Sequence, residues 1–212
     1  MNRNRRPILV LAVGVLLVAA VSCGRSAEPA DRSARSGGSG TTSLAASAAG
    51  TAAPGHCAGT IGDREVDEVR VPAGATCTLD GTVVDGNVSL AHGATLRARN
   101  VDVDGDVEAE GAEYVELRAG SRIGGNVQVD TGGAVMVTDS VIDGDLELEQ
   151  NRGAIAVQHT HVRGNLAADE NRGPATIEHN DVGGDLTCEA NGPAPSVTDN
   201  DVSGNQEDQC AR

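Results

Sequence analysis

The chain has 212 residues, 39% of them hydrophobic, yet it contains no Trp, no Phe and a single Tyr. A globular core of this size normally buries several aromatic rings, so the composition indicates a narrow core filled by Val, Leu, Ile and Ala. The formal net charge is −15, all 16 basic residues are Arg, and no basic cluster follows the extreme N-terminus, which excludes nucleic-acid binding through phosphate neutralisation.

Residues 1–22 have the pattern of a bacterial export signal. An arginine-containing start precedes an apolar run from Ile8 to Val21, which is shorter than the roughly 20 residues that a membrane-spanning helix needs. The run ends in Ala20-Val21-Ser22-Cys23, which resembles the lipobox of bacterial lipoproteins, although that family prefers Leu where this chain has Ala20. The resemblance implies cleavage before Cys23 and lipidation of its thiol, with anchoring to the outer face of the cell membrane. The alternative is an ordinary secretory signal and a secreted protein.

Residues 23–56 predict a flexible tether. The segment consists largely of Ala, Ser, Gly, Thr and Pro and has almost no large apolar side chain, so it cannot bury enough surface to offset the entropy lost on ordering. A flexible coil of about 33 residues has an end-to-end distance of roughly 30 Å. Such a tether would hold the following domain just off a membrane surface.

Residues 57–212 carry a repeat of about 20 residues that determines the fold class. Glycines followed by Asn or Asp recur at positions 86, 105, 125, 144, 164, 184 and 204. Between them, apolar and polar residues alternate in short runs such as Val127-Gln128-Val129 and Leu146-Glu147-Leu148, a pattern that predicts strands with one buried face. Stacked units of this kind predict an all-β, single-domain, right-handed parallel β-helix, a solenoid of about eight coils with equivalent residues about 4.8 Å apart.

The residue after each repeated glycine alternates strictly between Asn and Asp. In a solenoid these positions form a column, the Asn/Asp column: Asn87, Asp106, Asn126, Asp145, Asn165, Asp185 and Asn205. Stacked carboxylates repel by about 1 kcal/mol per neighbouring pair in water, so interleaved amides are expected to separate the charges and to donate hydrogen bonds to the carboxylates above and below. The glycines are expected at a corner that requires positive φ or a close backbone approach. A calcium ladder is disfavoured because half of the column is amide.

Four cysteines follow Cys23, and their spacing predicts two disulfides. Cys57 and Cys77 are one coil apart, and Cys188 and Cys210 are separated by about one coil plus a turn. Stacked positions bring Cα atoms within the range that a disulfide accepts, and an exported protein retains disulfides. We therefore predict the pairs Cys57–Cys77 and Cys188–Cys210, one at each end of the rod, where a terminal coil has a neighbour on one side only.

A second column is rich in side chains of the metal-ligand type. Positions 20 apart carry Asp139, His159, His179 and Asp199, and two residues further on lie His161, Asp181 and Asp201. If both sets share a strand face, imidazoles and carboxylates converge within two coils, which suits a divalent metal such as Zn²⁺. The candidate ligands, here called the His/Asp column, are His159, His161, His179, Asp181 and Asp199. The simpler interpretation is a solvated face on which histidines stack or pair with aspartates, and pH sensing is a further alternative.

The units VDGNV, VDGDV, IGGNV and IDGDL, found between Val69 and Gln206, are similar to the repeats of bactofilin-type polymer-forming β-helices and of a group of secreted actinobacterial lipoproteins. Bactofilins are cytosolic, lack cysteines and polymerise through apolar end coils. This chain instead has an export signal, cysteines at both ends of the repeat region and a polar end, SGNQEDQCAR. A polar last coil caps a solenoid against end-to-end growth, so we expect a monomer.

These features together predict a lipid-anchored, extracytoplasmic protein with a non-enzymatic structural or interaction role in the cell envelope. The expected partners are the membrane, through Cys23, and a cell-wall polymer or envelope protein, without nucleic acid and without a required cofactor. The alternative is a module that binds a divalent metal or an envelope polymer through the His/Asp column. A polysaccharide lyase or hydrolase, activities known on parallel β-helices, is less favoured, since the chain has no Trp, Phe or Lys and no long loop to build a cleft.

Overall fold

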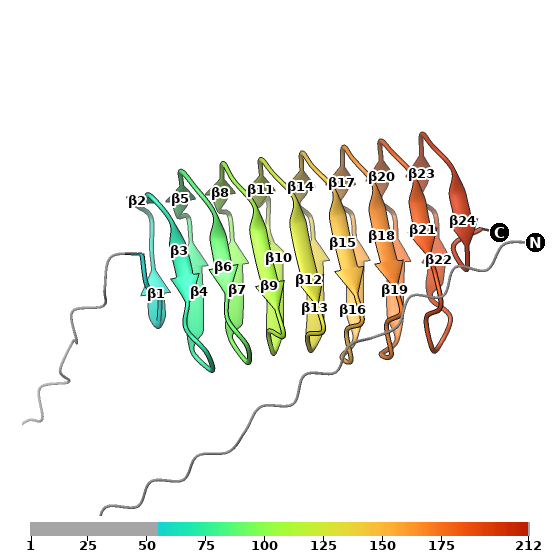
Figure 1. Cartoon of the computed structure of the whole chain (residues 1–212). Coiled ribbons are helices and arrows are strands. Elements are labelled where there is room, and N and C mark those ends of the chain that lie inside the picture. Colours follow the sequence, from blue (N-terminus) through green and yellow to red (C-terminus); the bar gives the residue numbers. More distant parts are fainter. Residues whose placement is uncertain (1–54, 212) are drawn as a thin grey trace, which may run out of the picture. The chain divides into compact units, whose positions relative to one another are not determined.

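The computed structural model describes residues 55–211, and within that range the chain is all-β, with 24 strands and no helix. The described residues accordingly contain no helix with the length and apolar character needed to cross a membrane. The strands form three parallel eight-stranded sheets, and each coil gives one strand to each sheet (Figure 1). The predicted solenoid of about eight coils is therefore confirmed. The predicted signal peptide, Cys23 and nearly all of the predicted tether lie outside the described residues.

Each sheet collects every third strand of the chain. Sheet 1 contains β1 (Gly59–Ile61), β4 (Thr76–Asp80), β7 (Thr95–Arg99), β10 (Tyr114–Arg118), β13 (Ala134–Thr138), β16 (Ile155–Gln158), β19 (Ala175–Glu178) and β22 (Ser196–Thr198). Sheet 2 contains the two-residue strands β2 (Glu65–Val66), β5 (Val83–Val84), β8 (Asp102–Val103), β11 (Arg122–Ile123), β14 (Val141–Ile142), β17 (His161–Val162), β20 (Asp181–Val182) and β23 (Asp201–Val202). Sheet 3 contains β3 (Val69–Val71), β6 (Val88–Leu90), β9 (Val107–Glu110), β12 (Val127–Asp130), β15 (Leu146–Glu149), β18 (Leu166–Asp169), β21 (Leu186–Cys188) and β24 (Gln206–Asp208).

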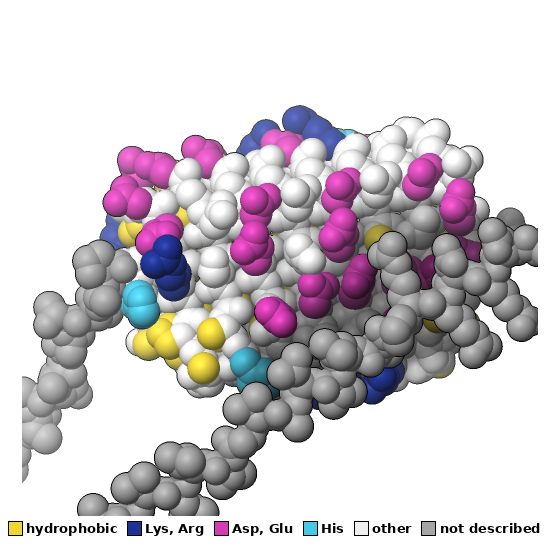
Figure 2. All heavy atoms as spheres, in the orientation of Figure 1, with side chains coloured by type: hydrophobic (Ala, Val, Ile, Leu, Met, Phe, Trp, Pro, Cys, Tyr) yellow, Lys and Arg dark blue, Asp and Glu magenta, His cyan; other side chains and the backbone are white. Residues whose placement is uncertain are grey.

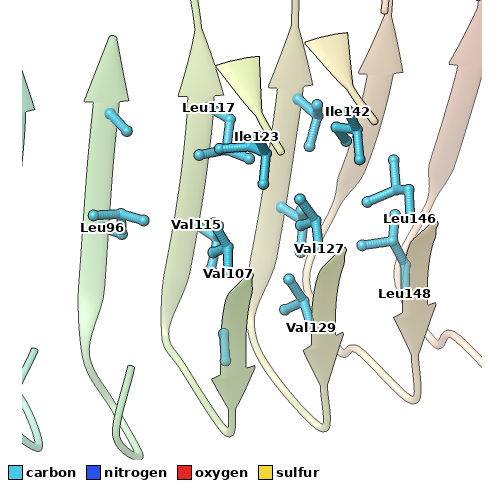
Figure 3. Packing of buried hydrophobic residues seen from close by; sticks show 14 of the residues in the cluster. Leu96, Val107, Val115, Leu117, Ile123, Val127, Val129, Ile142, Leu146 and Leu148 are labelled. Carbon is cyan, nitrogen blue, oxygen red and sulfur yellow. The ribbon is translucent and has the colours of Figure 1, made fainter. Parts of the chain in front are cut away.

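The register places residues 19 or 20 apart side by side, as the repeat requires. Val127 pairs with Leu146, which pairs with Leu166, and all three side chains are fully buried. Their neighbours one position along the strand face outward, so the predicted alternation is confirmed. Figure 3 shows aliphatic side chains from the three walls meeting inside the coils. A core only one side chain deep from each wall suits Val, Leu and Ile. Tyr114, the first residue of β10, is half-buried and lies outside this core.

In all coils after the first, two corners contain a residue in the left-handed region. At the ends of the sheet 1 strands the non-glycine residues with positive φ are Asn100, Ala119, Asp139, His159, His179 and Asp199, and at the ends of the sheet 3 strands they are Thr131, Gln150, Glu170, Ala190 and Asp208. Glycines, such as Gly81 and Gly93, have positive φ at these corners in the earlier coils. Asn, Asp and His adopt this conformation more readily than most other side chains. The identity of several residues in the His/Asp column thus has a backbone explanation.

Both predicted disulfides are confirmed, with Cα–Cα distances of 5.4 Å for Cys57–Cys77 and 5.1 Å for Cys188–Cys210. The first fastens the chain that enters the solenoid to β4, and the second fastens the turn after β24 to β21. Each closes a loop of about 20 residues, which in the chain-entropy account stabilises the fold by about 3 kcal/mol. The terminal coils, which lack one neighbour, are therefore covalently held.

Candidate functional site

The Asn/Asp column joins successive coils by one hydrogen bond per rung. The side-chain Oδ1 of each residue accepts from the backbone N–H of the residue one coil later, at 2.7–3.0 Å from Asn87 to Asn205. The donor differs from the expected one, since the main chain donates and not the side-chain amide of a neighbouring rung. Asn and Asp can both accept in this way, so the hydrogen bond does not select between them. Alternation leaves the carboxylates two coils, or roughly 10 Å, apart.

The glycine before each rung is required by the same contact. A Cβ placed on Gly164 would lie 2.7 Å from the carbonyl oxygen of Gly144 and closer still to Oδ1 of Asp145. The same clash occurs at Gly105, Gly125, Gly144, Gly184 and Gly204, none of which has positive φ. Of the two reasons expected for these glycines, close approach is therefore the one that applies, and the glycine–Asn/Asp pair is a device of the fold.

The His/Asp column forms pairs and stacks, not one cluster. His159 and His179 occupy the left-handed corner after sheet 1, and their rings stack with centroids 5.1 Å apart and planes 8° apart. The nitrogen lone pairs of an imidazole lie in the ring plane, so two parallel stacked rings direct them along parallel lines. This pair therefore does not converge on a single ion.

Of the other members, Asp199 occupies the same corner one coil after His179, while His161 and Asp181 lie beyond the corner in sheet 2. His161 begins β17, and its Nδ1 is 2.9 Å from Oδ2 of Asp181, while Nε2 of His179 is 3.6 Å from Oδ2 of Asp199. The expectation that residues 159 and 161 share a strand face assumed extended backbone, and the left-handed turn separates them. In the part of the chain that the structure describes, no three His, Cys, Asp or Glu side chains are placed to hold a metal. The structure thus does not bring His159, His161, His179, Asp181 and Asp199 together around one position.

The outward face of sheet 3 is strongly acidic. Successive coils place a carboxylate at the same outward position, forming the acidic column: Glu110, Asp130, Glu149, Asp169 and Glu189. No ion pair within residues 55–211 includes any of these five. In Figure 2, where the strands of sheet 3 lie toward the viewer, acidic side chains are spread over this face. Its uncompensated charge repels anions and attracts cations.

Glu149 at the middle of the acidic column has a raised pKa. Partial burial is the largest cause, followed by the charges of Asp130, Asp169, Glu147 and Glu170. A groove of about 190 Å³ runs beside it and is lined by Glu149, Gln150, Asp169, Glu170 and Glu189. Ionised Glu149 therefore opposes folding, and its protonation favours it.

We expect Glu149→Gln to raise the free energy of unfolding at pH 7 by less than about 1 kcal/mol, because solvent screens a cross-strand like-charge contact at an exposed position. Because the pKa of Glu149 is raised in the folded state, the wild type has its full stability below the ordinary glutamate pKa of 4.5. It loses part of that stability as the pH rises through the higher pKa of the folded state. The gain should therefore vanish below about pH 4. Urea denaturation at both pH values measures it, with Glu207→Gln, whose in-register neighbour is Thr187, as the control. A loss of stability at pH 7 would contradict the prediction.

Sheet 1 carries the opposite feature, an arginine patch formed by Arg97, Arg99 and Arg118. In the register of β7 and β10, Arg97 lies opposite Glu116 and Arg99 lies opposite Arg118. Glu116 contacts Arg97 at 3.3 Å and Arg118 at 3.2 Å. Although Glu116 occupies an outward position of the strand, it is only 5% exposed. The hydrogen bonds and charge of Arg99 lower the pKa of Asp80.

Sequence reasoning missed two ladders of buried amides at the corners. Asn151, Asn171 and Asn191 lie between sheets 3 and 1, and Asn180 with the half-buried Asn200 lies between sheets 1 and 2. Each side-chain Nδ2 donates to a carbonyl oxygen at the end of the strand one coil earlier, at 2.6–2.9 Å. The repeated triplets Asn-Arg-Gly at 151 and 171 were the available signal, but they equally suit solvent-exposed turns.

Three features of the outer faces remain as candidates for function, namely the acidic column, the arginine patch and the His–Asp pairs. The Asn/Asp column, the glycines and the buried amides are explained by the fold. Comparison with protein-family models, with curated proteins and with solved structures finds no match to this chain.

Proposed function

We propose that the protein is a lipid-anchored extracytoplasmic rod with a non-enzymatic structural or interaction role in the cell envelope. The observation that carries the proposal is a regular solenoid fastened by a disulfide at each end. Disulfides persist in oxidising compartments, which supports a location outside the cytoplasm. The lipobox-like sequence ending at Cys23 supports the anchor.

The regularity of the coils supports a role through flat outer faces. From β1 to β24 the longest connection between strands is residues 189–195, and the others are shorter. Catalytic residues are disproportionately carried by loops on a rigid scaffold, and connections of this length offer little room for them. Contacts with partners would then be made by the outward strand residues.

The charge of the two ends supports a monomeric rod. The first described coil carries Asp63, Glu65, Asp67 and Glu68 against Arg64 and Arg70, and the last coil carries Asp199, Asp201, Glu207 and Asp208, so both ends have an excess of acidic residues. Head-to-tail stacking would bring these two acidic ends together at the strand spacing, where like charges repel. The polar, exposed β24 adds to this barrier.

Metabolic labelling with radioactive palmitate in a bacterium that processes lipoproteins tests the anchor. The full-length protein is expected to take up label and to sediment with membranes, and Cys23→Ala is expected to lose both. The Cys57→Ser/Cys77→Ser variant is the matched control and should keep its label, because these thiols form a structural disulfide. Label retained by Cys23→Ala, or absent from the wild type, would overturn the anchor, and glycan cleavage by the purified protein would overturn the non-enzymatic role.

A further inference from the structure

Two arginines lie directly opposite each other on the outer face of sheet 1. Arg99 on β7 is the in-register neighbour of Arg118 on β10. Like charges at directly opposite positions destabilise a sheet. The Arg99 and Arg118 side chains are 55% and 50% exposed, so both guanidinium groups lie on the same open surface. The sequence thus places two like charges opposite each other at an exposed position where most residues would be tolerated, and a local conflict of this kind is expected at a functional site.

The guanidinium groups of the arginine patch are held in place from the side. Asp80 accepts from Nε and Nη2 of Arg99 at 2.9 and 2.6 Å, and the buried Glu116 contacts both Arg97 and Arg118. Three guanidiniums facing two carboxylates leave one net positive charge in a chain of net charge −15. Each guanidinium has five N–H donors, so donors remain for a ligand. Fixing them in advance lowers the entropy lost on binding.

The patch adjoins a larger groove. A pocket of about 160 Å³ is lined by the three arginines with Asp80 and Thr78. A groove of about 570 Å³ follows the corner between sheets 3 and 1 and is lined by His92, Glu113, Tyr114 and Arg152 together with corner glycines. The guanidinium of Arg97 lies 4.9 Å from the centre of the Tyr114 ring, so these two residues join the pocket to the groove.

We propose that this surface binds an acidic saccharide, with the phosphate or carboxylate group of the ligand between Arg97, Arg99 and Arg118 and its sugar ring in the groove beside Tyr114. Guanidinium groups match the geometry of these oxyanions and bind them with two parallel hydrogen bonds. The groove offers one aromatic ring together with imidazole, carboxylate and guanidinium groups, which suits a ligand rich in hydroxyls. The acidic column ends the strands of sheet 3 beside the groove and repels an anion, so the acidic group of the ligand is expected at the arginine patch on sheet 1.

The site gives the proposed interaction role a ligand class, and it rests on the proposed extracytoplasmic location, where the protein would encounter that ligand. Its test uses full-length protein carrying Cys23→Ala, so the result does not depend on lipidation. Tyr114 is the only Tyr in a chain without Trp or Phe, and its fluorescence and ring proton signals therefore report on this site alone. Glucose 6-phosphate is expected to change both signals saturably at constant ionic strength, with glucose and inorganic phosphate at least about tenfold weaker. Inorganic phosphate binding as tightly as glucose 6-phosphate would overturn the saccharide assignment.

Charge-matched variants test the residues. Arg99→Gln/Arg118→Gln is expected to weaken glucose 6-phosphate binding by about tenfold or more, since two charge-assisted contacts are lost. Arg122→Gln/Arg163→Gln removes the same charge from two half-exposed arginines that share Asp143, and should stay within about twofold of the parent. Arg99→Lys/Arg118→Lys, which keeps the charge and the fold but loses the planar fork, should show an intermediate loss. Equal losses in the two glutamine doubles, or no loss in any patch variant, would overturn the site.

Discussion

Gly164→Ala is expected to lower the free energy of unfolding by about 2–4 kcal/mol. The added Cβ would lie 2.7 Å from the carbonyl oxygen of Gly144 and nearer still to Oδ1 of Asp145. Neither atom can move cheaply, because the carbonyl accepts from the backbone N–H of Gly164 and the carboxylate accepts from that of Asn165 at 2.7 Å. The coil must therefore widen locally or give up a hydrogen bond. Urea denaturation followed by circular dichroism measures the loss.

Gly62→Ala is the matched control for this variant. No heavy atom lies within 4 Å of a Cβ placed on Gly62, and its φ is outside the positive range, so the change should stay within about 0.5 kcal/mol. The double variant Asp145→Ala/Gly164→Ala should cost less than the sum of the two single changes, because the first change removes one of the clashing atoms. Equal stability of Gly164→Ala and Gly62→Ala would show that the glycine column is not set by close approach.

The fold could be predicted from the sequence because the 20-residue repeat and the alternation of apolar and polar residues must both be satisfied by one register between coils. A slip of β15 by one residue against β12 would turn Leu146 outward and Glu147 inward, so burial of the aliphatic residues excludes that register. Once the observed register holds, the cysteine pairs at both ends follow from their spacing. The prediction was therefore correct wherever a side chain's direction depends only on its position along an extended strand.

The corners were not predictable in the same way. The interval from residue 159 to residue 161 places both side chains on one face only if the backbone between them is extended, and the left-handed conformation of His159 breaks that condition. In the Asn/Asp column the sequence identified the acceptors, but the donor is a backbone N–H whose direction depends on the turn. Side-chain pairing at corners thus depends on dihedral angles that the repeat pattern does not specify.

The arginine patch shows a different limit. Positions 99 and 118 are 19 residues apart, so the repeat itself implies that the two arginines are neighbours. Their opposition becomes informative only beside the buried Glu116, the paired Asp80 and the contact of Arg97 with Tyr114, all of which depend on side-chain conformations. The sequence therefore contained the unfavourable pair but not the pocket around it.

Asn171→Ala is expected to destabilise the solenoid by about 3 kcal/mol, the cost of leaving two buried backbone groups without partners. Asn171 is fully buried. Its Oδ1 accepts from the backbone N–H of Asn151 at 2.9 Å, and its Nδ2 donates to the carbonyl oxygen of Leu148 at 2.8 Å and to Oδ1 of Asn191 at 3.1 Å. Alanine can do neither, and the site between two coils has no access to bulk water. Thermal and urea unfolding measure the change.

Two further variants separate the loss of hydrogen bonds from the loss of side-chain volume. Asn171→Asp has nearly the same shape, but an ionised carboxylate would face the oxygens of Leu148 and Asn191 without a donor, so it should be more destabilising at pH 7 than at pH 4, where a protonated carboxyl group donates. Asn165→Ala removes one acceptor at an exposed rung of the Asn/Asp column, where water can replace it, and should cost about 1 kcal/mol or less. If Asn171→Ala cost no more than Asn165→Ala, the buried amides would contribute no more than the exposed column, and the corners would be held by aliphatic packing alone.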